Sequence, residues 1–164
     1  QIPDRVLWTI AIFALLAAIA LGVGGAVEVS WWLLVFVIFG GFIVVAYNLE
    51  LFKGLFHSDP WFALSWGAFP ALTAYFAQSP TIRVEAVFVS VACLFLSAAQ
   101  RRLSTPVREL RRKIASVEGR MVLRDGTEIA VNDAALRRAP EGALRALSIA
   151  LPLLAAGLAA ARLL

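Results

Sequence analysis

The feature that most constrains this chain is a series of apolar blocks, each near the length needed to cross a lipid bilayer. A helix of about 20 apolar residues spans the hydrocarbon core, because each residue adds about 1.5 Å to a layer about 30 Å thick. Only 16% of the residues are charged and 61% are hydrophobic, whereas about a quarter are charged in an average soluble domain. The blocks cover residues 6–27, 31–52, 60–77, 80–99 and 142–164.

These blocks predict helices rather than strands. Only helices and closed barrels satisfy every backbone polar group in lipid, and none of the blocks shows the two-residue alternation of a barrel strand. We therefore expect an all-α membrane protein with about five transmembrane helices. Four of them form a transmembrane region over 1–100, and the fifth covers 142–164. Gly67 and Pro70 lie midway through the third block and predict a kink there.

A basic polar segment, 101–141, separates the fourth block from the fifth. Cytoplasmic loops carry an excess of Lys and Arg, so we predict that this segment is cytoplasmic, with the amino end inside and the carboxyl end outside. The high content of Ala and Arg is typical of a GC-rich bacterial genome, which points to the bacterial cytoplasmic (inner) membrane. The eleven basic residues in and just after the segment are Arg101, Arg102, Arg108, Arg111, Arg112, Lys113, Arg120, Arg124, Arg137, Arg138 and Arg145.

The basic segment has recognisable parts. Apolar residues recur on one helical face over 106–117, with basic residues around them, which predicts an amphipathic helix on the anionic inner leaflet. Residues 119–131 form two β-like runs around Asp125-Gly126, a strong hairpin signal. A lone hairpin is marginally stable in water, so it is expected to pack on the membrane domain or on a partner. Asn132-Asp133 then caps a short helix that leads to the fifth block.

Partners follow from the same features. The bilayer with its anionic inner leaflet is the first partner, and a lipid substrate is the second. Small residues spaced four apart in the last block, Ala155 with Ala159 and Gly157 with Ala161, favour close helix contact. This spacing is compatible with a homo-oligomer or with a second membrane chain. Nucleic-acid binding is not expected, because the arginine run is typical of topology and lipid contact.

Ionisable residues are costly in membrane spans and are therefore the first candidates for a functional site. A polar cluster closes the second block: Asn48, Glu50, His57 and Asp59. If the helix continues, Glu50 and His57 are seven residues apart and share one face. Such a donor set can bind a divalent cation, with Mg²⁺ first and Mn²⁺, Fe²⁺ or Zn²⁺ also compatible. Arg101 and Arg102 emerge on the same side and suit a diphosphate or another anionic headgroup.

Each member of this cluster also has a simpler interpretation. Asp59 precedes Pro60 and is more typical of a helix cap than of a metal ligand. Glu50 can pair with Lys53 or with Arg101, and Asn48 can hydrogen-bond a neighbouring helix. His57 can be an ordinary interfacial residue. The single histidine excludes bis-histidine haem ligation within this chain, and the single cysteine, Cys93, excludes an intrachain disulfide.

The stretch Ala46-Tyr-Asn48-Leu-Glu50-Leu-Phe52, followed by a short loop and another span, resembles the UbiA-type intramembrane prenyltransferases. In that family an Asn-Asp-x-x-Asp motif closes a span and binds Mg²⁺ with an isoprenoid diphosphate. The resemblance implies that Asn48 matches the asparagine and Glu50 a nearby carboxylate. The chain departs from the family in motif spacing, in lacking a second Asp-rich motif and in having five spans rather than about nine. Residues 47–78 and 100–112 also resemble an uncharacterised bacterial multi-pass membrane family.

Three functions remain open on the sequence alone. The first is an intramembrane enzyme, or part of one, that acts on a lipid or isoprenoid-like substrate through a cytoplasmic-side divalent cation. The second is a non-catalytic membrane subunit that docks a larger complex. The third is a transporter, which ranks last because Glu50 and Glu85 are the only acidic residues in or near span interiors.

Overall fold

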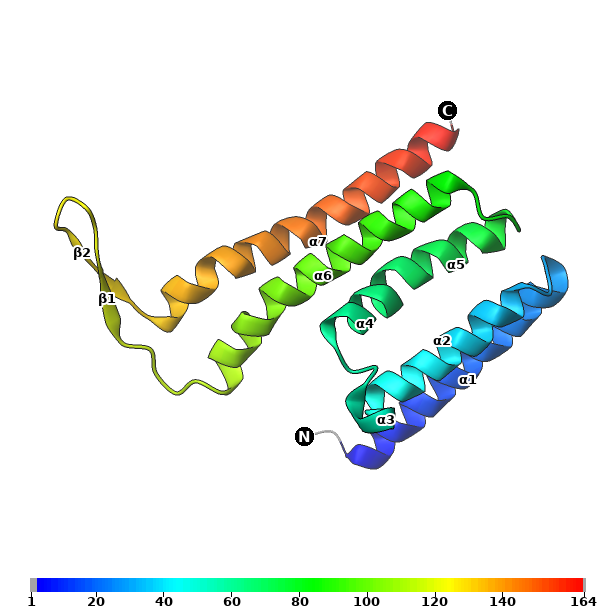
Figure 1. The fold of residues 1–164 in the computed structure, drawn as a ribbon, viewed down its shortest axis with the longest axis horizontal. Helices are drawn as coiled ribbons and strands as arrows, with labels where there is room; N and C mark the ends of the chain where they lie inside the picture. Colours follow the sequence, from blue (N-terminus) through cyan, green and yellow to red (C-terminus); the bar gives the residue numbers. More distant parts are fainter. Residues whose placement is uncertain (1–2, 164) are drawn as a thin grey trace. The chain divides into compact units, whose positions relative to one another are not determined.

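The computed structural model describes residues 3–163, except for the side chains of 162 and 163. It divides into two compact units, Gln1–Ala98 and Ala99–Leu164, and each is described here by itself. The elements in chain order are α1 Asp4–Glu28, α2 Leu33–Asn48, α3 Leu51–Gly54, α4 Asp59–Ala63, the π-helix η1 Leu64–Ala68, α5 Phe69–Gln78, α6 Val84–Arg112, β1 Gly119–Val122, β2 Glu128–Val131 and α7 Asp133–Leu163 (Figure 1).

The helices confirm the membrane class. Among the described residues, three helices are long and apolar enough to cross a membrane: Asp4–Glu28, Val84–Arg112 and Asp133–Ala161. Helix α2 is apolar but only 16 residues long. The third apolar block is helical but divided into three elements, and the fourth helix begins at Val84 rather than at Pro80. The chain is therefore a mostly helical protein of membrane type with one small sheet.

The first unit is built around α2. Helices α1 and α2 form an antiparallel pair (Figure 1), and a Cβ on Gly22 of α1 would meet Val37 Cγ2 of α2 at 2.5 Å. The other side of α2 packs aromatic rings on α5, with the Phe36 and Phe76 centroids 5.1 Å apart. Ile43 of α2 is almost fully buried. Helix α2 thus packs on α1 with one side and on α5 with the other.

The third apolar block contains a π-turn where a kink was predicted. The Phe69 N–H donates to the carbonyl of Leu64, which is five residues back, whereas an α-helical N–H donates to the carbonyl four residues back. Pro70 follows at the start of α5 and has no N–H to continue an α-helical ladder, so a widened turn just before it accommodates the missing donor. Gly67 lies in the π-turn, against Cys93 and Ser97 of α6.

The second unit has longer helices than the sequence predicted. Helix α6 continues through Pro106 to Arg112, so the prediction of a new helix that begins at 106 is wrong. The separate amphipathic helix over 106–117 is not formed, because 106–112 are the end of α6 and 114–118 are not helical. Helix α7 likewise begins at Asp133 and passes through Pro140, so the short capped helix and the fifth block are one element. The cap is confirmed, since Asn132 Oδ1 accepts the Ala135 N–H at 2.8 Å.

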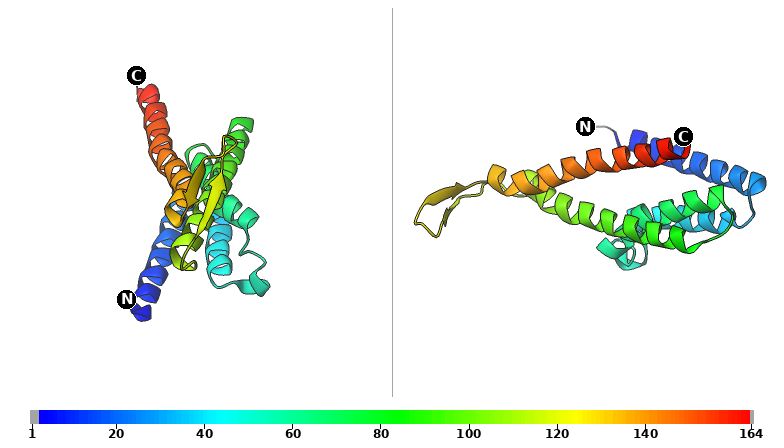
Figure 2. Two further views of the ribbon diagram at one scale, coloured as in Figure 1. Left: turned by 90° about the vertical axis from the view of Figure 1, so that its left-hand side faces the viewer. Right: turned by 90° about the horizontal axis from the view of Figure 1, so that it is seen from above.

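The hairpin prediction over 119–131 is confirmed. Strands β1 and β2 pair antiparallel, with Met121 opposite Ile129. Gly126 has φ +86°, the left-handed conformation that glycine adopts readily, and Asp125 Oδ1 accepts the Thr127 N–H at 2.9 Å. This hydrogen bond lowers the pKa of Asp125. Figure 2 shows the hairpin projecting from the amino end of α7.

Candidate functional site

The polar cluster lies on an irregular turn where α2 ends, not on a continued helix. Glu50, Phe52 and Lys53 have positive φ values of 50°, 55° and 59°, and Gly54 follows at 77°. The left-handed conformation costs roughly 1–2 kcal/mol for each residue that carries a Cβ. The Gly54 N–H donates to the Glu50 carbonyl at 3.0 Å. The helical continuation that would place Glu50 and His57 on one face is therefore not present.

His57 is held by the end of α2. Its Nδ1 lies 3.0 Å from the Tyr47 carbonyl oxygen. A carbonyl only accepts hydrogen bonds, so Nδ1 carries the proton and donates it. The imidazole also stacks on the Tyr47 ring, with centroids 4.5 Å apart. In the neutral ring Nε2 is then the acceptor nitrogen, the form that can take a proton or bind a cation.

Aromatic side chains anchor this turn on both sides. Tyr47 is buried and contacts Trp66 of η1, with ring centroids 4.6 Å apart. Trp66 in turn stacks on Phe62 of α4 at 5.4 Å. On the other side Phe56 packs on Trp61 at 4.8 Å. Aromatic pairs of this kind contribute about 0.5–1.5 kcal/mol each beyond their burial, which helps to offset the strain of the left-handed residues.

The structure does not gather the four predicted ligands. Asn48 Nδ2 donates to the Val44 carbonyl at 2.8 Å, which leaves Oδ1 as the acceptor of the amide. Glu50 is exposed on the left-handed turn, and Asp59 is the first residue of α4. Within residues 3–163 no group of three or more His, Cys, Asp or Glu side chains is placed to hold a metal ion. The divalent-cation site at Asn48, Glu50, His57 and Asp59 therefore stays a prediction.

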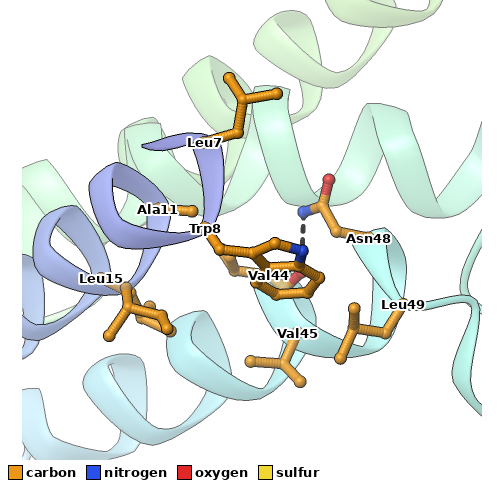
Figure 3. A pocket seen from close by; sticks show the side chains of 9 residues that line it. Leu7, Trp8, Ala11, Leu15, Val44, Val45, Asn48 and Leu49 are labelled. Carbon is orange, nitrogen blue, oxygen red and sulfur yellow. Dashed lines mark hydrogen bonds between the residues drawn. The ribbon is translucent and has the colours of Figure 1, made fainter. Parts of the chain in front are cut away.

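A cavity of about 480 Å³ lies between α1 and α2, a volume typical of small-molecule sites. Its walls are apolar apart from the indole N–H of Trp8 and the amide of Asn48 (Figure 3). Asn48 and the cavity-lining Leu49 directly precede the strained turn at Glu50. This cavity could not be predicted from the sequence, because Trp8 is typical of an interfacial aromatic residue until the pairing of α1 with α2 is known. The lining residues are Leu7, Trp8, Ala11, Ile12, Leu15, Val44, Val45, Asn48 and Leu49.

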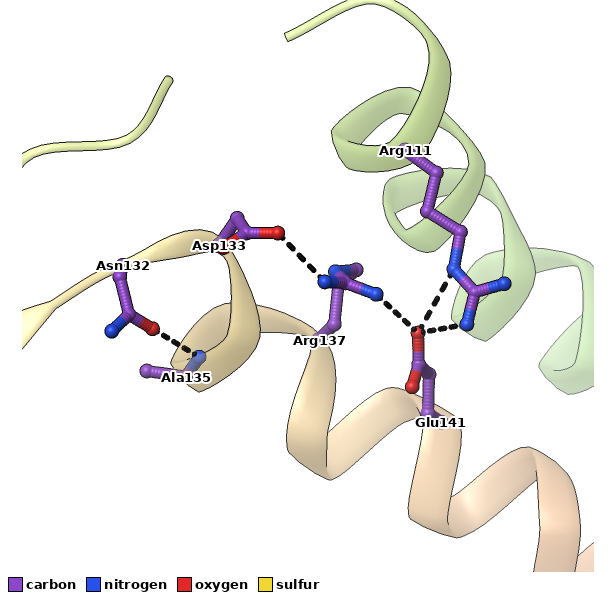
Figure 4. A network of polar contacts seen from close by, with 6 residues as sticks. All are labelled: Arg111, Asn132, Asp133, Ala135, Arg137 and Glu141. Carbon is purple, nitrogen blue, oxygen red and sulfur yellow. Dashed lines mark hydrogen bonds and ion pairs between the residues drawn. The ribbon is translucent and has the colours of Figure 1, made fainter. Parts of the chain in front are cut away.

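Arg101 and Arg102 lie on α6 in the second unit, and the predicted anion site at these residues stays a prediction. A polar network that spacing did not reveal lies further along this unit (Figure 4). Glu141 of α7 accepts Arg111 Nη2 of α6 at 2.7 Å and Arg137 Nη1 at 3.2 Å. Arg137 Nη2 also donates to Asp133 at 2.6 Å. The four-residue spacing of Asp133, Arg137 and Glu141 is the only sequence signal for it.

This network shifts the pKa values of its carboxyl groups, which precede the apolar part of α7. The hydrogen bond from Arg111 lowers the pKa of Glu141, and the charge of Arg137 acts in the same direction. The hydrogen bond from Arg137 lowers the pKa of Asp133. Arg137 is itself held in its charged form, because its hydrogen bond to Asp133 raises its pKa. We call this group of four side chains the α6–α7 clamp.

The fold and its cavity define an α-helical protein of membrane type with an apolar groove beside a polar, strained turn. No family model, no curated protein and no solved structure matches this chain.

Proposed function

We propose that this protein binds the apolar chain of a lipid or isoprenoid-like molecule in the α1–α2 groove, and that it is an intramembrane enzyme, or part of one, acting on that molecule. The observation that carries the proposal is the cavity of about 480 Å³, which is apolar along its length and polar at Asn48. An amphiphile fits this pattern. Its apolar chain would lie along the groove in place of bilayer lipid, and its polar end would reach the turn that begins at Glu50.

The chemistry of the polar end is supplied by a few side chains. Asn48 Oδ1 accepts hydrogen bonds, and His57 Nε2 is an acceptor in the neutral ring. Glu50 adds an exposed carboxylate. We retain the divalent cation, Mg²⁺ first, as part of the proposal, with Arg101 and Arg102 as headgroup ligands. The described positions do not gather the four cation ligands, so we derive no reaction step through the ion.

The proposal includes five membrane crossings in the bacterial inner membrane, with the amino end inside and the carboxyl end outside. The three long apolar helices support three of these crossings. The elements α4, η1 and α5 run without a break from Asp59 to Gln78, a length of about 30 Å. Helix α2 is about 24 Å long, which is shorter than the hydrocarbon core. It can cross the bilayer if Trp31 and Trp32, which precede it, lie in the interfacial layer that tryptophan prefers.

Filling the groove tests the proposal. Ala11 lines the cavity, so Ala11→Trp is expected to exclude the chain of the ligand. Ala20→Trp is the matched control, because nine residues along α1 turn the side chain to the opposite face, where it is exposed. Lipid extracted from the detergent-solubilised proteins is identified and counted by mass spectrometry. We expect one tightly held amphiphile per wild-type chain, its retention by Ala20→Trp and at least a tenfold loss in Ala11→Trp. Equal retention by both variants contradicts the groove.

The same preparations address the cation. Metal analysis with titration of Mg²⁺ and Mn²⁺ compares the wild type with Glu50→Ala and His57→Ala. Stoichiometric binding that both variants lose supports the enzyme, because these side chains then share one ion. Absence of binding in the wild type removes the cation from the proposal and leaves the lipid groove to be judged by lipid retention alone.

A second candidate, the non-catalytic subunit of a larger complex, rests on the hairpin. The alternation of a strand places Met121, Leu123 and Ile129 on one face of the hairpin, and all three are more than 40% exposed. An uncovered apolar face of this kind suits a protein partner. A purified chain that is monodisperse as a single copy and turns over its own lipid contradicts this candidate.

A further inference from the structure

The end of α6 presents two faces of different character. On one face Val107 is buried, and Arg111 is paired with Glu141 in the α6–α7 clamp. The other face surrounds a shallow cavity of about 240 Å³, whose lining residues are Thr105, Arg108, Glu109, Arg112 and Lys113. These positions recur every three or four residues and form one stripe on the helix. The stripe is therefore a surface that packing within this unit leaves available.

Two of the cations on this stripe are not neutralised by a carboxylate. Lys113 pairs with Glu109 at 3.2 Å, whereas Arg108 donates only to the neutral hydroxyl of Thr105, at 3.4 Å. Arg112 has no carboxylate partner within residues 3–163. Two guanidinium groups beside a hydroxyl provide the planar, multiple donors that a phosphate group accepts. The stripe therefore has the chemistry of a phosphate site.

The continuity of α6 through Pro106 places this stripe on the helical extension that follows the apolar part of α6. The apolar run ends at Ala99, so Arg101 and Arg102 mark the point where the helix leaves the hydrocarbon core. Thr105 then lies about one turn and Arg112 about three turns beyond this point, next to the lipid headgroups. Side chains on a helix lean toward its amino end, so Arg108 and Arg112 lean back toward the bilayer.

We propose that Thr105, Arg108 and Arg112 form a binding site for the phosphate of an anionic phospholipid headgroup. The site is separate from the α1–α2 groove and does not depend on the proposed function. The separate helix expected over 106–117 would have spread its charge along the membrane plane, whereas the extended α6 concentrates two guanidinium groups and a hydroxyl on one short stripe. A headgroup of one negative charge fits the two unneutralised arginines.

The test measures the affinity of the full-length, detergent-solubilised protein for short-chain phosphatidylglycerol and phosphatidylcholine in mixed micelles. The key variant is Arg108→Gln/Arg112→Gln. Its matched control is Arg124→Gln/Arg138→Gln, which removes two exposed charges from the same segment. Each basic residue near a headgroup contributes about a factor of five in affinity. We expect the wild type and the control to prefer phosphatidylglycerol, and the key variant to bind it at least tenfold more weakly.

A second variant distinguishes a site that depends on guanidinium geometry from attraction by positive charge alone. Arg108→Lys/Arg112→Lys keeps both charges and removes only the planar guanidinium groups, so it is expected to weaken binding severalfold. Equal affinity in this variant and the wild type overturns the proposal, as does an equal loss in the key variant and its control. Full competition by millimolar inorganic phosphate also overturns it, because the site then takes a free anion rather than a lipid. Unchanged circular dichroism in every variant verifies that the helices are retained.

Discussion

At the residue scale, one glycine decides how closely two helices of the first unit approach. A Cβ added to Gly67 would lie 2.5 Å from the Cys93 carbonyl oxygen and 2.8 Å from Ser97 Cβ. The first of these neighbours is backbone and cannot rotate away. From the sequence, Gly67 predicted only a kink together with Pro70. Its role as a contact point depends on which helix lies opposite, and local sequence does not contain that information.

We predict that Gly67→Ala destabilises the protein by about 1–3 kcal/mol, because the helices must separate to admit the methyl group. Gly24→Ala is the control, since no atom lies within 4 Å of the added Cβ and alanine favours the helical state by up to about 1 kcal/mol. The measurement is thermal unfolding in detergent followed by circular dichroism. A midpoint for Gly67→Ala equal to that of the wild type contradicts the close approach.

For the predicted cation site too, local sequence indicated which residues are candidates but not how they are arranged. The identities of Asn48, Glu50, His57 and Asp59 could be selected from the sequence because polar groups are rare in this chain. Their geometry could not, because it depends on where α2 ends. The left-handed turn at Glu50 breaks the seven-residue spacing, and the hydrogen bond between His57 and the Tyr47 carbonyl is set by that turn.

At the element scale, the hairpin was predictable and the helix boundaries beside it were not. Asp125-Gly126 specifies a turn through local backbone preferences alone. Thr105-Pro106 has equally strong local preferences for a helix start, yet α6 continues through it. Proline inside a helix costs about 3 kcal/mol, so contacts made elsewhere in the fold must help to offset that cost. The Arg111–Glu141 pair is one such contact, and it requires α7, which is distant in sequence.

We predict that the α6–α7 clamp makes stability depend on pH in the acidic range. The folded pKa values of Asp133 and Glu141 are both lowered. Their contribution is therefore complete above the unfolded carboxyl pKa of about 4 and is lost as the pH falls through the lowered folded values. The thermal midpoint of the wild type is expected to be level between pH 7 and about 5 and to fall below about 4.

Glu141→Gln removes one of these carboxyl groups, so its midpoint is expected to be lower at pH 7 and to change less on acidification. Glu118→Gln is the control, because Glu118 is exposed between α6 and β1 and outside the clamp. Midpoints that respond to acid identically in all three proteins contradict a role for the clamp.

At the scale of the whole molecule, composition and block length were enough to predict a helical membrane protein, because the bilayer admits few alternatives. The number of crossings is a finer question. Three helices meet the length and hydropathy of a span, while α2 and the divided third block depend on their flanking residues. The proposed topology places those flanks at the membrane interface.

We predict that single cysteines in a Cys93→Ser background report the crossing by α2 that the five-crossing topology requires. Lys53→Cys and Arg124→Cys are expected to react with a membrane-impermeant maleimide only after the cells are permeabilised, whereas Glu28→Cys reacts in intact spheroplasts. Permeabilised cells provide the control for reactivity, since all three positions are exposed. Labelling of Lys53→Cys from outside contradicts a crossing by α2.

The α1–α2 groove also determines how its occupant arrives. Most residues along it are exposed, so under the proposed function the lipid reaches it by lateral diffusion within the leaflet and needs no passage through water. Lipids are at very high local concentration there, so mere occupancy of the groove does not limit the proposed function. Tight binding then serves the selection of one lipid over another, and under the proposal this selection falls to the few polar atoms around Asn48.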